Sequence, residues 1–263
     1  MIRPLGSALV LLALLVGTAR AHEGLHRRIA ALEAKIHAAP EDVPPRVEHA
    51  RLLREGGHAE QAAAALDGLA AIAPGHPLLL LERGLLALET GDDPAPWLDA
   101  HLASPDPRAV GFDARAALHE GAGRPWAALS DRQDAWQRGP TPDRALAFAA
   151  ALERVGDHPC AALALADAER QLAGAIVVRL ERVEVLLRGR MDARAAARAL
   201  VDDAPDNPDR WLLLARATEP TDPDQAHGLR ERALQLATQR LADRPSAVRE
   251  AALARARASL EAP

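Results

Sequence analysis

The 263-residue chain contains a single cysteine and no tyrosine, and aromatic residues make up only 2% of it. One cysteine excludes an intrachain disulfide, so no covalent crosslink stabilises the fold. Cys160 opens the apolar run "CAALAL", which predicts a small buried side chain rather than a nucleophile. A core poor in aromatic residues has to be built from alanine and leucine, whose small size lets helices approach closely. Because β-branched runs are almost absent as well, the composition predicts an all-α protein.

An excess of positive charge is also missing, as are the motifs of common enzyme classes. The formal net charge is −5 at pH 7, which argues against nucleic acid or an anionic membrane surface as a partner. The sequence contains no glycine-rich phosphate loop and no G-x-S-x-G motif around a nucleophilic serine. We therefore expect a protein that is not an enzyme and needs no cofactor.

Residues 1–21 have the pattern of a secretory signal peptide. Arg3 precedes the apolar run Leu5–Val16, and the small residues Ala19 and Ala21 occupy the positions that signal peptidase reads. The run is shorter than the roughly 20 residues that cross a bilayer, which makes an uncleaved anchor the less favoured alternative. We expect a periplasmic or secreted protein that begins at His22, without stable membrane insertion of the mature chain.

Two interleaved series of turn-forming residues indicate an internal repeat. The glycines recur at spacings of 34, 32, 33 and 33 residues, and Asp222 continues the series at 33; the prolines recur at 34, 33 and 33. A shared period predicts tandem units of about 34 residues, each a helix, a glycine turn, a second helix and a proline turn. We expect the helix pairs to stack into a solenoid, since an ordinary bundle needs no such fixed phase. The two series are Gly57, Gly91, Gly123, Gly156 and Gly189, and Pro40, Pro74, Pro107 and Pro140.

The unit from about Val43 to His76 resembles a tetratricopeptide repeat. It carries that family's small, large, glycine and proline positions as Ala50, Leu53, Gly57, Ala62, Leu66 and Pro74. Later units depart from the pattern, because Pro94 and Pro96 delay one second helix and the unit after Ala175 is one residue short. The resemblance implies a right-handed α-solenoid of antiparallel helix pairs. About six repeats would cover residues 43–245, between an N-terminal helix (22–42) and a C-terminal capping helix (246–263).

The same resemblance implies a binding function. Tetratricopeptide proteins mostly act as scaffolds, in which the first helices of successive units line a groove that holds a protein or peptide partner. The family register places four leucines of one unit on this groove: Leu78, Leu81, Leu85 and Leu88. These form either an apolar patch for an amphipathic partner segment or the packed side of an inner helix, and periodicity does not separate the two. Four charged residues also fall at groove positions, as readers of a charged peptide end or as solvated surface charges: Arg51, Arg54, Glu120 and Glu153.

The segment "HEGLH" at residues 22–26 supports an alternative function. It matches the H-E-x-x-H pattern of zinc proteases, but no protease domain surrounds it, so we discount that chemistry. If cleavage follows Ala21, the amine and imidazole of His22 would form a chelating pair with His26 one helical turn away, loosely resembling a histidine brace for copper. Copper or zinc binding by His22 and His26 is therefore the alternative to a polar helix start in which Glu23 favours the helix dipole.

Overall fold

The computed structural model describes residues 24–261, and the predicted signal peptide and His22 lie outside the described residues. All regular elements within the described range are α-helices, with no strand among them, which confirms the predicted all-α class. The same range holds no helix both long and apolar enough to cross a membrane.

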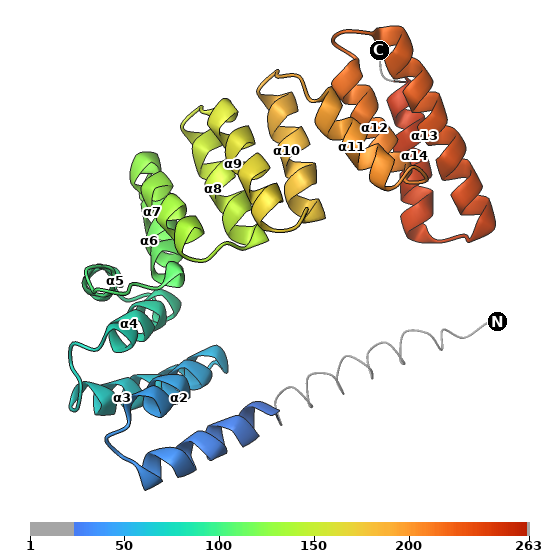
Figure 1. Ribbon diagram of the computed structural model, residues 1–263. Helices are drawn as coiled ribbons and strands as arrows, with labels where there is room; N and C mark the ends of the chain where they lie inside the picture. The colour runs from blue at the N-terminus through green and yellow to red at the C-terminus, as the bar shows by residue number, and fades with distance from the viewer. Residues whose placement is uncertain (1–23, 262–263) are drawn as a thin grey trace, which may run out of the picture. The chain divides into compact units, whose positions relative to one another are not determined.

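The chain divides into two compact units, Met1–Arg115 and Ala116–Pro263. In the first unit, a helix over residues 24–38 precedes two helix pairs whose members lie side by side (Figure 1). The core of this unit consists mainly of leucines from both pairs, among them Leu52, Leu66 and Leu79. The elements are α2 (Val43–Glu55), α3 (Ala59–Ala70), α4 (Pro77–Thr90), α5 (Ala95–Leu102) and α6 (Ala109–Gly121), the last of which contains the boundary between the units.

The second unit repeats the arrangement of paired helices. Its helix pair α8 and α9 lies beside α10, and α12, α13 and α14 pack against one another (Figure 1). Alanine makes up half of the buried cluster around α8 and α9, in which Ala149 and Ala161 are almost completely buried. The elements are α7 (Pro125–Arg138), α8 (Pro142–Arg154), α9 (His158–Gln171), α10 (Ile176–Arg188), α11 (Arg194–Asp203), α12 (Pro208–Thr218), α13 (Pro223–Asp243) and α14 (Ala247–Glu261).

Left-handed turn residues separate the two helices of most units. Four glycines of the predicted series, from Gly57 to Gly156, have φ between +66° and +84°, a region that glycine enters without steric cost. Gly189 also ends its helix, as the C-cap of α10, but its φ is −76° and the next residue, Arg190, takes the left-handed conformation at φ +53°. Asp222 lies in the turn between α12 and α13, where its side chain caps α13 by accepting a hydrogen bond from the backbone N–H of Gln225.

The prolines at residues 94 and 96 shorten one helix, as the sequence predicts. Pro94 is the N-cap residue of α5, and the helix from Ala95 has only eight residues. The backbone N–H of Leu98 still bonds to the Pro94 carbonyl, at 3.0 Å. As a result, α5 is shorter than α3, the second helix of the preceding pair, which has twelve residues.

The predicted burial of Cys160 is wrong, because the side chain is exposed. Its backbone N–H donates to the Asp157 carboxylate at 3.0 Å, which places the residue in the capped first turn of α9. The buried stripe of this helix runs instead through Ala161, Leu165 and Ala168, and Cys160 lies one residue outside it.

Candidate partner-binding surface

The four leucines predicted to face the groove differ widely in exposure. Leu81 is only 4% exposed and belongs to the core. Leu78 and Leu85 are half-buried, and Leu78 packs against the leucine core of the first unit. Leu88 is 36% exposed. The surface that α4 offers on this stripe is therefore made by Leu85 and Leu88, towards the end of the helix.

Arg54, predicted to face a partner, instead connects α2 to α4. Its Nε donates to Glu82 Oε2 at 2.9 Å and its Nη1 to Glu89 Oε1 at 2.5 Å. The Arg54 side chain is only 11% exposed, and burial raises the pKa of the Glu82 carboxyl although the Arg54 guanidinium opposes that shift. A buried charge of this kind is tolerated only when it is paired, so Arg54 is committed to an internal contact.

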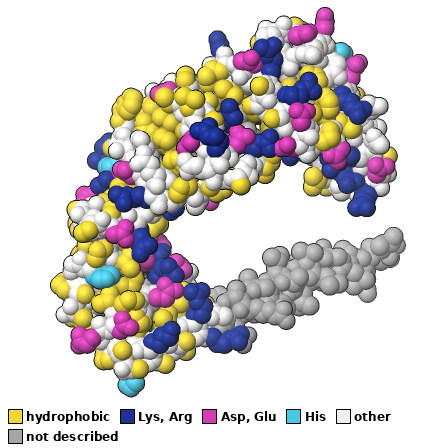
Figure 2. Space-filling view, in the orientation of Figure 1, with side chains coloured by type: hydrophobic (Ala, Val, Ile, Leu, Met, Phe, Trp, Pro, Cys, Tyr) yellow, Lys and Arg dark blue, Asp and Glu magenta, His cyan; other side chains and the backbone are white. Residues whose placement is uncertain are grey.

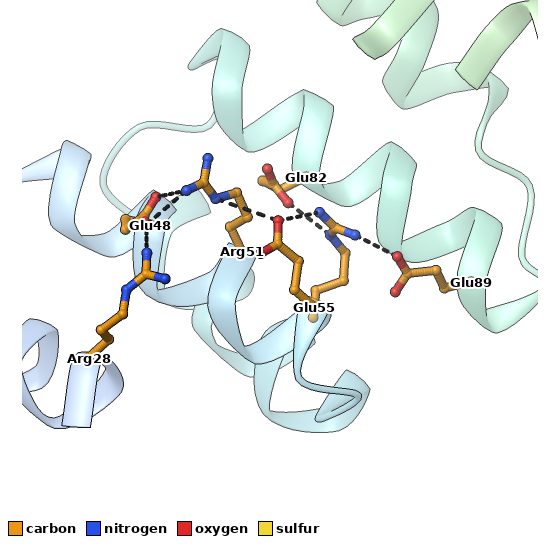
Figure 3. Close-up of polar contacts among 7 residues, drawn as sticks. Arg28, Glu48, Arg51, Glu55, Glu82 and Glu89 are labelled. Carbon is orange, nitrogen blue, oxygen red and sulfur yellow. Dashed lines mark hydrogen bonds and ion pairs between the residues drawn. The ribbon is translucent and has the colours of Figure 1, made fainter. Parts of the chain in front are cut away.

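The ion pairs continue from Arg54 across the face of α2. Arg51 donates to Glu48 at 2.8 Å and lies 3.7 Å from Glu55. Arg28, from the helix before α2, donates to the same Glu48 at 3.2 Å (Figure 3). We call this set the α2–α4 ion-pair cluster: Arg28, Glu48, Arg51, Arg54, Glu55, Glu82 and Glu89. Basic and acidic side chains accordingly lie intermixed on the visible face of the first unit (Figure 2).

The two glutamates predicted to face the groove are also paired within the chain. Glu120 accepts hydrogen bonds from Arg132 and Arg154, the latter at 2.8 Å. Glu153 holds Arg188 with both carboxylate oxygens, at 2.9 and 2.8 Å. Partial burial acts to raise the pKa of Glu120, but the two arginines outweigh it and hold the pKa below its ordinary value. The hydrogen bond from Arg188 likewise lowers the pKa of Glu153.

The same geometry recurs once more, between Glu184 of α10 and Arg216 of α12. Arg216 Nη1 donates to Glu184 Oε1 at 2.8 Å, and Arg216 Nη2 donates to Glu184 Oε2 at 3.1 Å. The paired residues are separated by 34, 35 and 32 positions, which is the repeat period. We call these three pairs the inter-helix ladder: Glu120–Arg154, Glu153–Arg188 and Glu184–Arg216.

Comparison with known proteins identifies the fold. No protein-family model and no curated protein matches the sequence. Among solved structures, the C-terminal part of a TPR repeat-containing protein from Cytophaga hutchinsonii matches 81% of this chain and 93% of its own, with a TM-score of 0.56 at 16% identity. The chain has the tetratricopeptide-repeat (TPR) fold.

Two further solved structures share this TPR fold over similar lengths. Pseudomonas aeruginosa pilF aligns with a TM-score of 0.52 at 15% identity and covers 86% of this chain and 96% of its own. PilW, described as a widely conserved type IV pilus biogenesis factor, aligns with a TM-score of 0.51 at 16% identity, over 79% and 96% respectively. At such identities the likeness establishes the fold alone.

The TPR register explains why the ladder lies where the sequence pattern suggested a binding surface. Glu120 and Glu153 occupy equivalent positions in consecutive units, and so do their partners Arg154 and Arg188. The pair of Arg54 and Glu89 in the first unit has the same spacing of 35 with the signs reversed. The signal available in the sequence was therefore opposite charge one period apart, which a position-by-position interpretation does not use.

Of the predicted metal ligands, only His26 lies among the described residues. Its ring centroid is 6.4 Å from that of His58, the residue that precedes α3. The sequence pattern had placed His58 only in a turn. Within residues 24–261 there is no group of three or more histidine, cysteine, aspartate or glutamate side chains arranged to hold a metal ion.

Proposed function

We propose that this chain is an exported TPR scaffold that binds a protein or peptide partner and performs no catalysis. The observation that carries the proposal is the position of Leu85 and Leu88 beside the α2–α4 ion-pair cluster. Leu88 is directly followed by Glu89, which Arg54 holds from the neighbouring helix. An apolar strip bordered by charged side chains suits an amphipathic partner segment, whose apolar residues are buried while its polar residues meet the rim.

The charge pattern supports selection by apolar contact rather than by a single charge. Arg54 is occupied internally, whereas Arg51 is 43% exposed and has carboxylates on both sides. Exposed pairs exchange partners easily because each contributes only about 0–1 kcal/mol. A partner can therefore form ion pairs with Arg51 or Glu55 at the rim, while its main contact is with Leu85 and Leu88.

The test is a pull-down from a bacterial envelope extract with Leu88→Asp. We expect this variant to lose the partner while retaining the helical circular dichroism and unfolding midpoint of the wild type, because Leu88 is exposed. Leu163→Asp, at a 69% exposed residue of α9, is the matched control and should keep the partner. If folded Leu88→Asp retains every partner that the wild type captures, the groove proposal is wrong.

Export is part of the proposal, because it determines the compartment in which the chain binds its partner. Its support is the sequence of residues 1–21, with an apolar run followed by Ala19 and Ala21. Mass spectrometry of the protein recovered from the periplasm or medium should show a chain that begins at His22. A full-length chain confined to the cytoplasm would contradict export without affecting the groove.

Copper or zinc binding is the second candidate function, and one observation favours it. His26, in the first described helix, and His58, the N-cap residue of α3, have their ring centroids 6.4 Å apart, and imidazole nitrogens suit both metals. Cu(II) titration of a chain that begins at His22 should show at least about tenfold weaker binding for His26→Ala and His58→Ala, since each removes one ligand. His227→Ala is the control. Equal affinity in all four proteins would reject the site.

A further inference from the structure

A second open surface lies between α3, α4 and α5, which we call the α3–α5 pocket. Its volume is about 490 Å³. Leu66 of α3 and Leu86 of α4 form the floor, and Ala63 and Trp97 line the sides. A volume of this size lies within the roughly 300–1,000 Å³ range of ligand pockets, and its apolar floor distinguishes it from a solvated surface depression.

The pocket is a direct consequence of the irregular unit in this part of the repeat. The late start of α5 at Ala95 limits that helix to eight residues. Two residues of α3 that line the pocket, Ala59 and Ala63, are too small to fill the space beside the short α5 helix. Trp97 is half-buried and provides the wall on the α5 side.

This pocket lies on the opposite side of α4 from the proposed groove. Arg83 and Leu86 line it, whereas Leu85 and Leu88 belong to the groove stripe. Successive residues of an α-helix are rotated by about 100°, so positions two apart point in nearly opposite directions. A partner in the groove therefore leaves the α3–α5 pocket accessible, and the two surfaces can be tested separately.

The rim of the pocket is acidic. Glu60, Asp67 and Asp92 line it together with one basic residue, Arg83. Arg83 donates to Asp67 at 2.6 Å, so that pair is neutral overall. Glu60 and Asp92 are exposed, and Asp92 accepts a hydrogen bond from the Thr90 hydroxyl at 2.7 Å, a contact that leaves its charge intact. Two uncompensated negative charges remain at the mouth.

The chain itself shows which kind of group the pocket wall accommodates. The guanidinium carbon of Arg83 lies 4.8 Å from the ring centroid of Trp97, within the distance of a cation–π contact. Lysine and arginine have long aliphatic stems that cover apolar surface while the charged end reaches polar groups. The floor of Leu66 and Leu86 would contact such a stem, and Glu60 and Asp92 would meet the charged end.

We propose that the α3–α5 pocket binds a lysine or arginine side chain of a partner protein together with an apolar residue beside it. This inference rests on the proposed scaffold function and adds a second contact to it, on the opposite side of α4. The combination of an apolar floor and a doubly negative mouth selects against acidic segments and against purely apolar ones.

Two blocked peptides serve as probes: acetyl-Leu-Arg-Leu-Ala-amide and its glutamine analogue, acetyl-Leu-Gln-Leu-Ala-amide. The reporter is the indole N–H signal of Trp97 in a ¹H–¹⁵N spectrum of the full chain, assigned by its loss in Trp97→Phe. We expect the arginine peptide to shift this signal saturably, with weaker binding as salt is added. We expect the glutamine peptide to bind at least about fivefold more weakly, since it lacks the charge.

Variants separate the pocket from the groove. Glu60→Gln with Asp92→Asn should weaken the arginine peptide about fivefold by removing both charges. Glu41→Gln with Asp42→Asn, two exposed acids of the same unit, should leave the affinity unchanged. Leu88→Asp should also leave it unchanged, so failure of the groove proposal would not affect this result.

Three outcomes would overturn the inference. Equal shifts with both peptides would show an apolar pocket without charge selection. The absence of any saturable shift would show that the pocket binds neither peptide. Binding of butylguanidinium as tight as that of the arginine peptide would identify a small organic cation, rather than a partner protein, as the ligand.

Discussion

At the scale of single residues, the close contact between α4 and α5 depends on the absence of a side chain. A Cβ atom added to Gly84 would lie 2.7 Å from Cδ2 and 2.8 Å from Cγ of Leu98. Real side chains do not approach this closely, so α4 and α5 could not keep their present separation with alanine at this position. Gly84 is itself buried in the interior of α4.

We expect Gly84→Ala to lower the free energy of unfolding by about 1–3 kcal/mol, because overpacking outweighs the higher helix propensity of alanine. Gly68→Ala is a matched control in α3, where the nearest atom to an added Cβ is Arg46 Nη1 at 3.8 Å. Without a clash, propensity alone should stabilise this variant by about 0.5–1 kcal/mol. Urea unfolding followed by circular dichroism measures both, and equal signs for the two variants would contradict the packing interpretation.

His101 is the buried polar residue that joins α5 to its surroundings. The backbone N–H of Arg108 donates to its Nε2 at 2.9 Å, so the proton is on Nδ1, which donates to the Pro77 carbonyl at 2.9 Å. The side chain is completely buried. Burial lowers the pKa of His101, and protonation of Nε2 would also break the hydrogen bond from Arg108.

This lowered pKa predicts a loss of stability in mild acid. Below the ordinary histidine pKa of about 6.5, the unfolded chain takes up a proton that the folded chain does not, so the free energy of unfolding falls as the pH falls. His101→Gln should reduce the slope of stability between about pH 6.5 and 5. His37→Gln, at an exposed histidine, should keep the wild-type slope. Identical slopes in all three proteins would exclude His101 as the titrating group.

At the scale of helices, the inter-helix ladder connects first helices of consecutive units. Its Glu184–Arg216 pair joins α10 to α12 with two hydrogen bonds, and the side chains are 32% and 55% exposed. Exposed ion pairs contribute little individually to the free energy of unfolding. Because they are spaced by one repeat period, however, each pair of helices in the ladder is joined by the same arrangement of opposite charges.

A double-mutant cycle with Glu184→Gln and Arg216→Gln measures this contribution. We expect a coupling energy of about 0.3–1 kcal/mol in urea unfolding, decreasing with added salt as an exposed ion pair requires. The more buried Glu153–Arg188 pair serves as the comparison and should couple more strongly and respond less to salt. A coupling near zero for both pairs would mean that the ladder is only a consequence of helix packing.

The sequence was sufficient to predict helices, turns and the small buried positions, because each follows from a local rule. Glycine at left-handed turns and proline at helix starts act within a few residues. The ladder and the α3–α5 pocket depend instead on which residues become neighbours after stacking. Arg54 illustrates the difference: its groove register was predicted, but its capture by Glu82 follows from the placement of α4 against α2.

At the scale of the whole molecule, stability is expected to be local. The chain forms two compact units, and clusters such as the one around Leu66 and the one around Leu165 lie in different units. In repeat proteins each element contacts mainly its neighbours, so stability is approximately a sum of unit and nearest-neighbour terms. A destabilising substitution in one repeat unit is therefore expected to leave the stability of a distant unit unchanged.

Hydrogen exchange measured by mass spectrometry tests this locality with Gly84→Ala. Because the clash is confined to α4 and α5, amide exchange should become faster in peptides from α2 to α5 and stay unchanged in peptides from α12 to α14. The reciprocal variant is Ala215→Leu, which overpacks a completely buried position of α12 and should accelerate exchange only in the second unit. Uniform acceleration by either variant would show that the described chain unfolds as one cooperative body, against nearest-neighbour stability.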